Sequence, residues 1–302
     1  MPFTSTMTLA ANVDDSLITI WDQGVILTYT PELVADQLAT IKKNEQAKQI
    51  DFTIYSNLAL PSALTEDTDP TSVALVDTLA YITPAEEGLV VTRGALASFQ
   101  TGGKVDTAAA QLVGRNMGAT QDKRAITALE AFTTEIIYPN TAVSAATCAD
   151  TDVLDYRFAS RLYNKLARKN VMGINGSYFA IAHDDCLFDL RADLVPVRQY
   201  ADLSGVMMNE IGMAAGIRWL RSSNVTVTSN SNGTIDTYKV CVVGANALGK
   251  AVSNEPHPVI TSTDKLSRFV NIGWYGCFAY GVIDVTAMTQ GICASSVGAN
   301  AA

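Results

Sequence analysis

The segment from Gly244 to Lys250, GANALGK, comes nearest in this sequence to a ligand-binding motif. Its glycines and lysine match the first seven positions of the phosphate-binding loop of nucleotide hydrolases, and a strand-like segment precedes it. However, Ala251 stands where that motif needs a hydroxyl ligand for magnesium, and only about fifty residues follow, too few for the sheet of such a domain. We therefore expect a strand–turn–helix junction whose glycines provide backbone freedom, and keep nucleotide binding as a minor alternative.

A second candidate site is the run His183-Asp184-Asp185-Cys186. A Cys–His nucleophile needs both side chains within hydrogen-bonding reach and a third group that orients them. A metal site would need further His or Cys ligands, and the only other histidine, His257, stands between two prolines in a predicted loop. We expect no catalytic residue, metal or cofactor here, and we expect Asp184 to cap a short helix that ends at Arg191.

Composition narrows the class of protein. The 302 residues are 48% hydrophobic, which is enough for one large or two moderate domains. Only 17% are charged, and such sparse charge predicts a surface that other copies cover. The net charge of −9 disfavours binding to free DNA, although an acidic wall can enclose DNA. No window suits a membrane span or a secretory signal, and the five scattered cysteines favour buried free thiols.

The first third of the chain is predicted to be extended. Residues 1–29 suggest an arm, and Thr30-Pro31 is typical of a helix start, with an apolar stripe continuing to Ile41. Alternation then predicts strands at 50–54 and 73–81, joined by a long loop. Residues 51–92 hold seven acids and no Lys or Arg. Because a two-stranded ribbon is barely stable alone, we expect this acidic ribbon to lie on a neighbouring subunit.

Helical and strand patterns alternate in the rest of the chain. A long helix is predicted over about 106–136 and a second over about 153–170, where Arg157, Arg161, Lys165 and Arg168 form a basic stripe. This stripe is interpreted either as a solvated face or as a partner surface for acidic segments of another copy. Strands are expected at 178–182, 216–220, 225–227, 238–243 and 269–285.

The order of these elements, with several short phrases, resembles the Hong-Kong-phage-type capsid family of tailed double-stranded-DNA bacteriophages. The phrases are LVADQLATI (33–41) before IDFTI (50–54), EEGLVVTRGALAS (86–98), Gln121-Asp122-Lys123, GVMMNEIGMAAG (205–216), YKVCVVGANALGK (238–250) and VNIGWYGCFAY (270–280). Together these phrases cover about 250 residues in the family's order. The resemblance implies an α+β major capsid fold with an N-arm, an extended E-loop, a peripheral (P) domain with a long spine helix, and an axial (A) domain.

The resemblance also implies a division of the chain. Residues 1–48 would form the N-arm and first helix, 49–93 the E-loop, 94–150 the P-domain with the spine helix at about 106–136, 151–255 the A-domain, and 256–302 the returning P-domain strands and tail. The expected function is a non-enzymatic shell protein that forms pentamers and hexamers around DNA in the virion, assembled in the host cytoplasm. Because residues 51–92 contain no lysine, cross-linking through an E-loop lysine is excluded.

Implied partners are other copies of the chain, a portal protein, and a separate scaffolding or decoration protein. Assembly-interface candidates are the ribbon acids Glu66, Asp67, Asp69, Glu86 and Glu87, with the four basic residues of the stripe facing them. Three alternatives stay open at this point: an encapsulin-like compartment shell, a tail or decoration protein, and an enzyme with a phosphate-binding loop or a Cys–His pair.

Overall fold

A computed structural model describes residues 33–55, 58–61, 63–64, 66–67, 69–102, 104–199, 206–231, 233–262, 266 and 268–297. The predicted arm, the helix start at Thr30-Pro31 and the C-terminal tail from Gly298 lie outside these residues. Among the described residues, no helix is both long enough and apolar enough to span a membrane.

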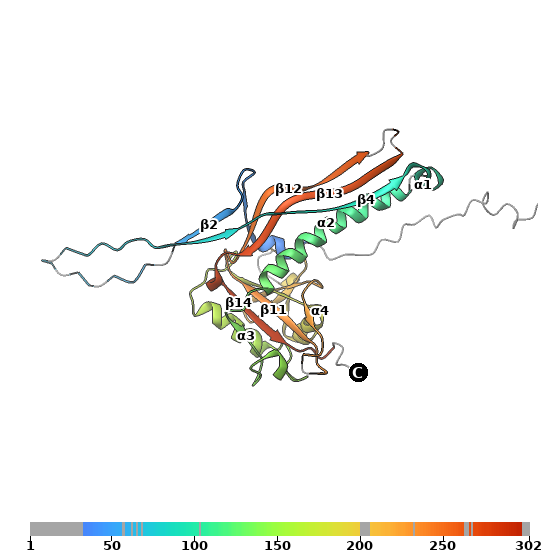
Figure 1. Cartoon of the computed structure of the whole chain (residues 1–302). Coiled ribbons are helices and arrows are strands. Elements are labelled where there is room, and N and C mark those ends of the chain that lie inside the picture. Colours follow the sequence, from blue (N-terminus) through green and yellow to red (C-terminus); the bar gives the residue numbers. More distant parts are fainter. Residues whose placement is uncertain are drawn as a thin grey trace, which may run out of the picture.

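The upper part of the molecule is an elongated four-stranded sheet, antiparallel except for β1, with a long helix along one face (Figure 1). Its strand order is β1-β12-β13-β4, with β1 Ala39–Lys43, β12 Leu248–Ser262, β13 Phe269–Val282 and β4 Ala85–Gly94. A short helix, α1 Ala95–Gln100, leads from β4 to the long helix α2 Lys104–Glu130. Val113 of α2 packs on Trp274 and Phe278 of β13, and the Trp274 indole Nε1–H donates to Asn116 Oδ1 at 3.0 Å. These contacts fix the helix lengthwise on the sheet.

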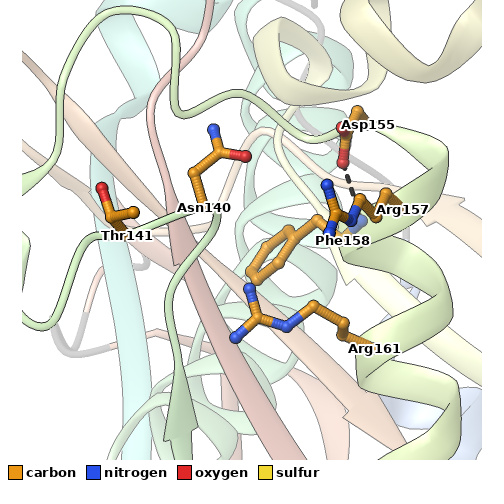
Figure 2. A pocket seen from close by; sticks show the side chains of 6 residues that line it. All are labelled: Asn140, Thr141, Asp155, Arg157, Phe158 and Arg161. Carbon is orange, nitrogen blue, oxygen red and sulfur yellow. Dashed lines mark hydrogen bonds between the residues drawn. The ribbon is translucent and has the colours of Figure 1, made fainter.

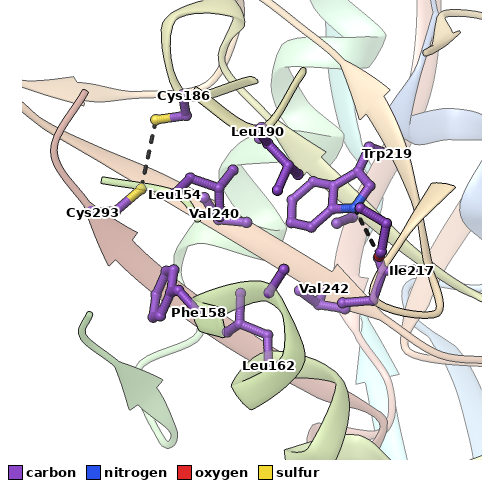
Figure 3. Close-up of a cluster of buried hydrophobic side chains, with 14 of the residues drawn as sticks. Leu154, Phe158, Leu162, Cys186, Leu190, Ile217, Trp219, Val240, Val242 and Cys293 are labelled. Carbon is purple, nitrogen blue, oxygen red and sulfur yellow. Dashed lines mark hydrogen bonds between the residues drawn. The ribbon is translucent and has the colours of Figure 1, made fainter. Parts of the chain in front are cut away.

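The lower part is a compact eight-stranded sheet with helices on both faces (Figure 1). The strand order is β5-β14-β11-β6-β9-β8-β7, and β10 pairs with β11 outside this path. The strands are β5 Ile136–Ile137, β14 Met288–Cys293, β11 Thr237–Val243, β6 Tyr178–Ala182, β9 Ile217–Arg221, β8 Glu210–Ala214, β7 Val195–Pro196 and β10 Val227–Thr228. Helices α3 Tyr156–Ala167 and α4 Asp184–Leu190 bury Phe158, Leu162 and Leu190 against one face, around Trp219 (Figure 3). The other face packs on the C-terminal half of α2 through Ile126 and Leu129.

A third, two-stranded sheet projects away from both parts (Figure 1). Strands β2 Ile50–Tyr55 and β3 Asp77–Ile82 pair antiparallel, with Tyr55 opposite Asp77. Within the described residues of this ribbon, the packed part is its base, where Ile50, Phe52 and Ile82 contact Ala251 and Ile283. All described residues between 58 and 76 are exposed, so this loop has no core of its own, as the sequence predicted.

The first predicted helix, with its apolar stripe to Ile41 and with Lys42, Lys43 and Lys48 near its C-terminal end, is wrong beyond residue 38. Ala35–Leu38 form one 3₁₀ turn, and β1 follows at once, in parallel register with β12 from Ala39 opposite Leu248. The apolar spacing of Val34, Leu38 and Ile41 suits a helix, but only the first two side chains are buried. A long-range strand pairing therefore overrides the local period.

The long helix was predicted six residues too long at its C-terminal end. It ends at Glu130, and Ile136 pairs in parallel with Gln290 of β14 instead of continuing the helical stripe. The Glu130 carboxylate holds this end in place, because it accepts hydrogen bonds from the Thr226 N–H at 2.6 Å and the Thr226 hydroxyl at 2.5 Å. The helix predicted over 153–170 is confirmed as α3, with Asp155 as its N-cap.

The expected strand–turn–helix junction at 244–250 is also corrected. No helix follows the turn, because Leu248 begins the fifteen-residue strand β12. His257 lies within this strand and not in a loop. Smaller corrections concern limits: β3 begins at Asp77 rather than near 73, β13 ends at Val282 rather than 285, and the strand expected at 225–227 is β10.

Candidate functional site

Lys250, the lysine of the GANALGK segment, lies in the core and is fully occupied there. Its Nζ donates to Asp36 Oδ1 at 2.7 Å and to Gln121 Oε1 at 3.0 Å, and the side chain is only 8% exposed. The Tyr280 hydroxyl donates to the same Asp36 oxygen at 2.6 Å. The pKa of Tyr280 is raised, mainly because the side chain is buried and also because the Asp36 carboxylate lies beside it. The lysine thus ties β12 to the 3₁₀ turn and to α2, and it does not present its charge to a phosphate.

A second buried carboxylate holds the same N-terminal segment. Asp122 of α2 is completely buried, and its Oδ1 accepts the backbone N–H groups of Val34 and Ala35, each at 2.8 Å. Its Oδ2 accepts from Asn224 Nδ2 at 2.8 Å and from the Ser222 hydroxyl at 3.3 Å. The point where residues 33–38 join the body is therefore fixed by charge-assisted hydrogen bonds.

The run at 183–186 does not form a Cys–His nucleophile. His183 Nδ1 accepts the Asp185 N–H at 3.3 Å, so that His183, rather than the predicted Asp184, caps α4. Cys186 Sγ lies 3.6 Å from Cys293 Sγ (Figure 3), and burial raises its pKa well above the usual range. The thiol is thus shifted away from the reactive thiolate, and no group of three potential metal ligands gathers in the described part of the chain.

These surroundings predict the order in which the thiols react. Cys277 is partly exposed, while the other four cysteines are buried. Burial raises the pKa of Cys148 to about 11 and that of Cys241 to about 12, so that roughly a thousandth or less of each is thiolate at pH 8. Titration of the unassembled chain with a thiol-specific disulfide reagent should show one fast thiol and four slow ones. A fast reaction that survives Cys277→Ser would contradict this assignment.

The ribbon acids are spread over two different environments. Glu66, Asp67 and Asp69 are exposed in the loop beyond β2 and β3, and Glu86 is exposed on β4. Glu87 instead pairs within the chain with Arg124 of α2, at 2.8 Å between Oε1 and Nη2. Sequence reasoning missed this pair, because nothing in the local pattern places residue 87 beside the C-terminal part of α2.

The basic stripe on α3 also divides into two groups. Lys165 Nζ pairs with Glu135 Oε1 at 3.1 Å, and Lys169 pairs with the other oxygen of the same carboxylate. Arg168 is exposed at the C-terminal end of α3, where a cation favours the helix dipole. Arg157 and Arg161 are exposed, and no hydrogen bond or ion pair engages their guanidinium groups among the described residues.

Arg157 and Arg161 line one side of an open cavity of about 370 Å³ (Figure 2). Asn140 and Thr141, from the segment after β5, line the opposite side, and Phe158 and Asp155 complete it. Asn140 is held by its Nδ2, which donates to Asp152 Oδ1 at 2.8 Å, and one Asp155 oxygen accepts the Phe158 N–H at 2.7 Å. No local pattern indicated Asn140 or Thr141, because only the tertiary fold brings them to α3.

A shallow apolar groove of about 400 Å³ lies on the elongated sheet. Gly273 pairs with Val90 on one side and Val259 on the other, so these three residues share a face. The neighbouring residue Trp274 points to α2, which places the groove on the opposite face. A Cβ at Gly273 would meet the Leu89 carbonyl oxygen at 2.5 Å, so glycine permits the close approach of β4.

No protein-family model matches the sequence, and a comparison with curated proteins finds no match. Solved structures do match. A chain from the capsid of Ralstonia phage GP4 is similar with a TM-score of 0.73 and 10% sequence identity, over 96% of this chain and 98% of that one. A chain from the capsid of the cyanophage P-SCSP1u has a TM-score of 0.69 at 14% identity, over 96% of each chain. The head structure of Helicobacter pylori bacteriophage KHP40 gives 0.67 at 12% identity, over 97% of this chain and 98% of that one.

These similarities establish the fold. They extend over nearly the whole of each chain, and so include the projecting ribbon, the long helix and the compact sheet together. The chain therefore has the α+β fold of these phage capsid chains, and the fold expected from the sequence resemblance is confirmed.

Proposed function

We propose that this chain is the major capsid protein of a tailed double-stranded-DNA bacteriophage. Copies would form pentamers and hexamers that tile an icosahedral shell around the genome. The observation that carries the proposal is the whole-chain similarity of the fold to chains of several phage capsids. The sequence resemblance to the Hong-Kong-phage-type family supports it independently, since that comparison rested on residue phrases and element order.

The exposed ribbon supports self-association. Between residues 58 and 79 the exposed fraction is 95% for Leu60, 74% for Leu64 and 71% for Val73, and Leu58, Leu75, Val76 and Leu79 are also more than half exposed. Fully burying one such side chain contributes about 1.5–3 kcal/mol. A ribbon this apolar, extended from the body, is best explained by a neighbouring subunit beneath it. We assign it to the E-loop, within residues 49–93.

The remaining domains follow the same comparison. Residues 94–150 with α2 as the spine helix, and the returning strands after residue 256, would form the P-domain, and the compact sheet the A-domain. Because β12 already begins at Leu248, the A-domain would end before residue 248 rather than at the predicted 255. The N-terminal region would include β1 in place of the predicted helix.

A structural role, rather than an enzymatic one, is supported by the two chemical motifs. Lys250 serves as the buried partner of Asp36, and Cys186 packs against Cys293 in the core. We assign the protein to the virion, assembled in the host cytoplasm, with a portal protein and a separate scaffolding or decoration protein as partners. The net charge of −9 supports a shell that encloses DNA without binding its phosphates tightly.

Electron microscopy tests this function. The full chain, expressed alone and together with its neighbouring genes, should form closed icosahedral particles or rings of five and six subunits. A chain that remains a stable monomer in both preparations would refute the proposal. Particles that enclose a protein cargo and no DNA when produced in infected cells would assign the chain to a compartment shell instead.

A further inference from the structure

We propose that the cavity lined by Arg157 and Arg161 is a carboxylate-binding site that receives an acidic side chain from the 58–76 loop of a second copy. This inference rests on the proposed shell function and names a contact by which neighbouring subunits recognise each other. The cavity, formed by these two residues with Asn140, Thr141, Asp155 and Phe158, is called the Arg157–Arg161 pocket.

The charge arrangement in the pocket lacks a counter-charge within the chain. Arg157 and Arg161 are one helical turn apart, a spacing at which like charges destabilise a helix. Lys165, farther along α3, and Lys169, just beyond its C-terminal end, share Glu135, whereas no such pairing engages the two arginines in the part of the chain described. Asp155 contributes one negative charge, but one of its oxygens is used as the helix N-cap. The pocket therefore keeps a net positive charge.

The geometry suits a carboxylate. Both guanidinium groups turn toward the segment that carries Asn140 and Thr141, and an open space separates them from that segment (Figure 2). A guanidinium presents N–H donors in a fixed fork that matches the two oxygens of a carboxylate, which makes such pairs shorter and stronger than neutral hydrogen bonds. Phe158 forms an apolar side wall of this open pocket.

The loop of a second copy is the occupant that the charges favour. Glu66, Asp67 and Asp69 are exposed, and no hydrogen bond or ion pair engages them within the described residues. They lie in the connection between β2 and β3. The ribbon formed by these strands projects away from the body (Figure 1). Because residues 51–92 contain no Lys or Arg, the loop carries no positive charge that would oppose its approach to the pocket.

The central test reverses the charge of the pocket with R157E/R161E in the full chain. The substitutions should leave the monomer folded, because they replace two exposed arginines, and the acid introduced at position 157 would lie in the first turn of α3, where it favours the dipole. We expect at least an approximately tenfold loss of closed particles, since each contact is repeated across the whole shell. Arg191→Glu, at an exposed arginine elsewhere on the compact part, should assemble as the unchanged protein does.

A binding measurement makes the test independent of particle formation. A fluorescent peptide of residues 58–76 should bind the full chain, and R157E/R161E should weaken binding about tenfold. A peptide with Glu66, Asp67 and Asp69 changed to lysine should bind R157E/R161E more tightly than it binds the unchanged chain. A full chain that carries these three lysines together with R157E/R161E should form closed particles again.

The outcomes separate the two proposals. Normal shells from R157E/R161E, with unchanged peptide binding, would overturn the pocket assignment while leaving the shell function intact. Normal shells that retain less DNA would also overturn it, and would assign the arginines to phosphate. If the unchanged chain forms no particles at all, the shell function fails, whatever the peptide does.

Discussion

Replacing residues 56–76 by a two-residue Asn-Gly turn should yield a folded chain that no longer builds closed shells. Tyr55 and Asp77 are direct partners in the β2–β3 register, so that a type I′ turn can close the shortened hairpin. The packed base of the ribbon, formed by Ile50, Phe52 and Ile82, is retained. Every described residue that is removed is exposed, so folding loses little while assembly loses several apolar anchors. Two Leu side chains alone represent about 3–6 kcal/mol of interface burial.

Thermal unfolding and electron microscopy of the same preparations would measure this result. The melting temperature should stay within a few degrees of that of the unchanged chain. The deletion removes exposed residues, so we expect it to lower the free energy of unfolding by no more than a surface substitution does, about 0.5 kcal/mol or less. A matched control is Met172→Ser, which removes a 79% exposed side chain outside the ribbon and should not impair assembly. Closed shells in normal yield from the shortened chain would show that the ribbon is not an assembly element.

Lys250→Ala should destabilise the fold by about 3–5 kcal/mol, which is the usual cost of removing one partner from a buried ion pair. The substitution leaves Asp36 without its ammonium partner, and it also frees Gln121 from its contact at 3.0 Å. The loss falls where β12, α2 and the segment at 33–38 meet, so we expect a lower midpoint of chemical denaturation for the whole chain. The control Lys43→Ala removes an exposed pair with Glu255 and should leave the midpoint nearly unchanged.

A double substitution separates the charge effect from lost packing. Asp36→Ala added to Lys250→Ala removes the unpaired carboxylate, so that part of the lost stability should return. An unchanged midpoint in Lys250→Ala would mean that the lysine contributes nothing to the core, and it would reopen the question of a ligand at Gly244–Lys250.

Much of the local structure could be predicted from the sequence, because the signal was local. The buried strand β6 is a short unbroken apolar run, β11 ends in the apolar run Val240–Val243, and α3 carries Phe158, Leu162 and Leu166 on one helical face. The exposed ribbon was indicated by alternation at 50–54 and by a stretch of acids without basic residues. In each case the neighbours along the chain decide the conformation, and period and charge are visible in the sequence.

Strand β12 could not be predicted from the sequence. It contains Pro256, Pro258 and several polar residues, a composition that argues against a strand. The structure explains the exception: β1 pairs with β12 only up to Val252, and beyond that point no other described strand pairs with this edge, so a missing N–H costs little. The same long-range pairing turned residues 39–43 into a strand.

The sequence by itself determined the elements whose apolar faces repeat along the chain, the acidic ribbon and the arginines of α3. Only the tertiary structure decided which groups meet: Lys250 with Asp36, Asp122 with the backbone of residues 34 and 35, and Arg157 and Arg161 with Asn140. The first of these pairs is separated by 214 positions along the chain, and the contact of Asp122 with residue 34 by 88. Periodicity reports which side of an element is buried, but the partner of a polar group depends on how sheets and helices pack, which no local pattern encodes.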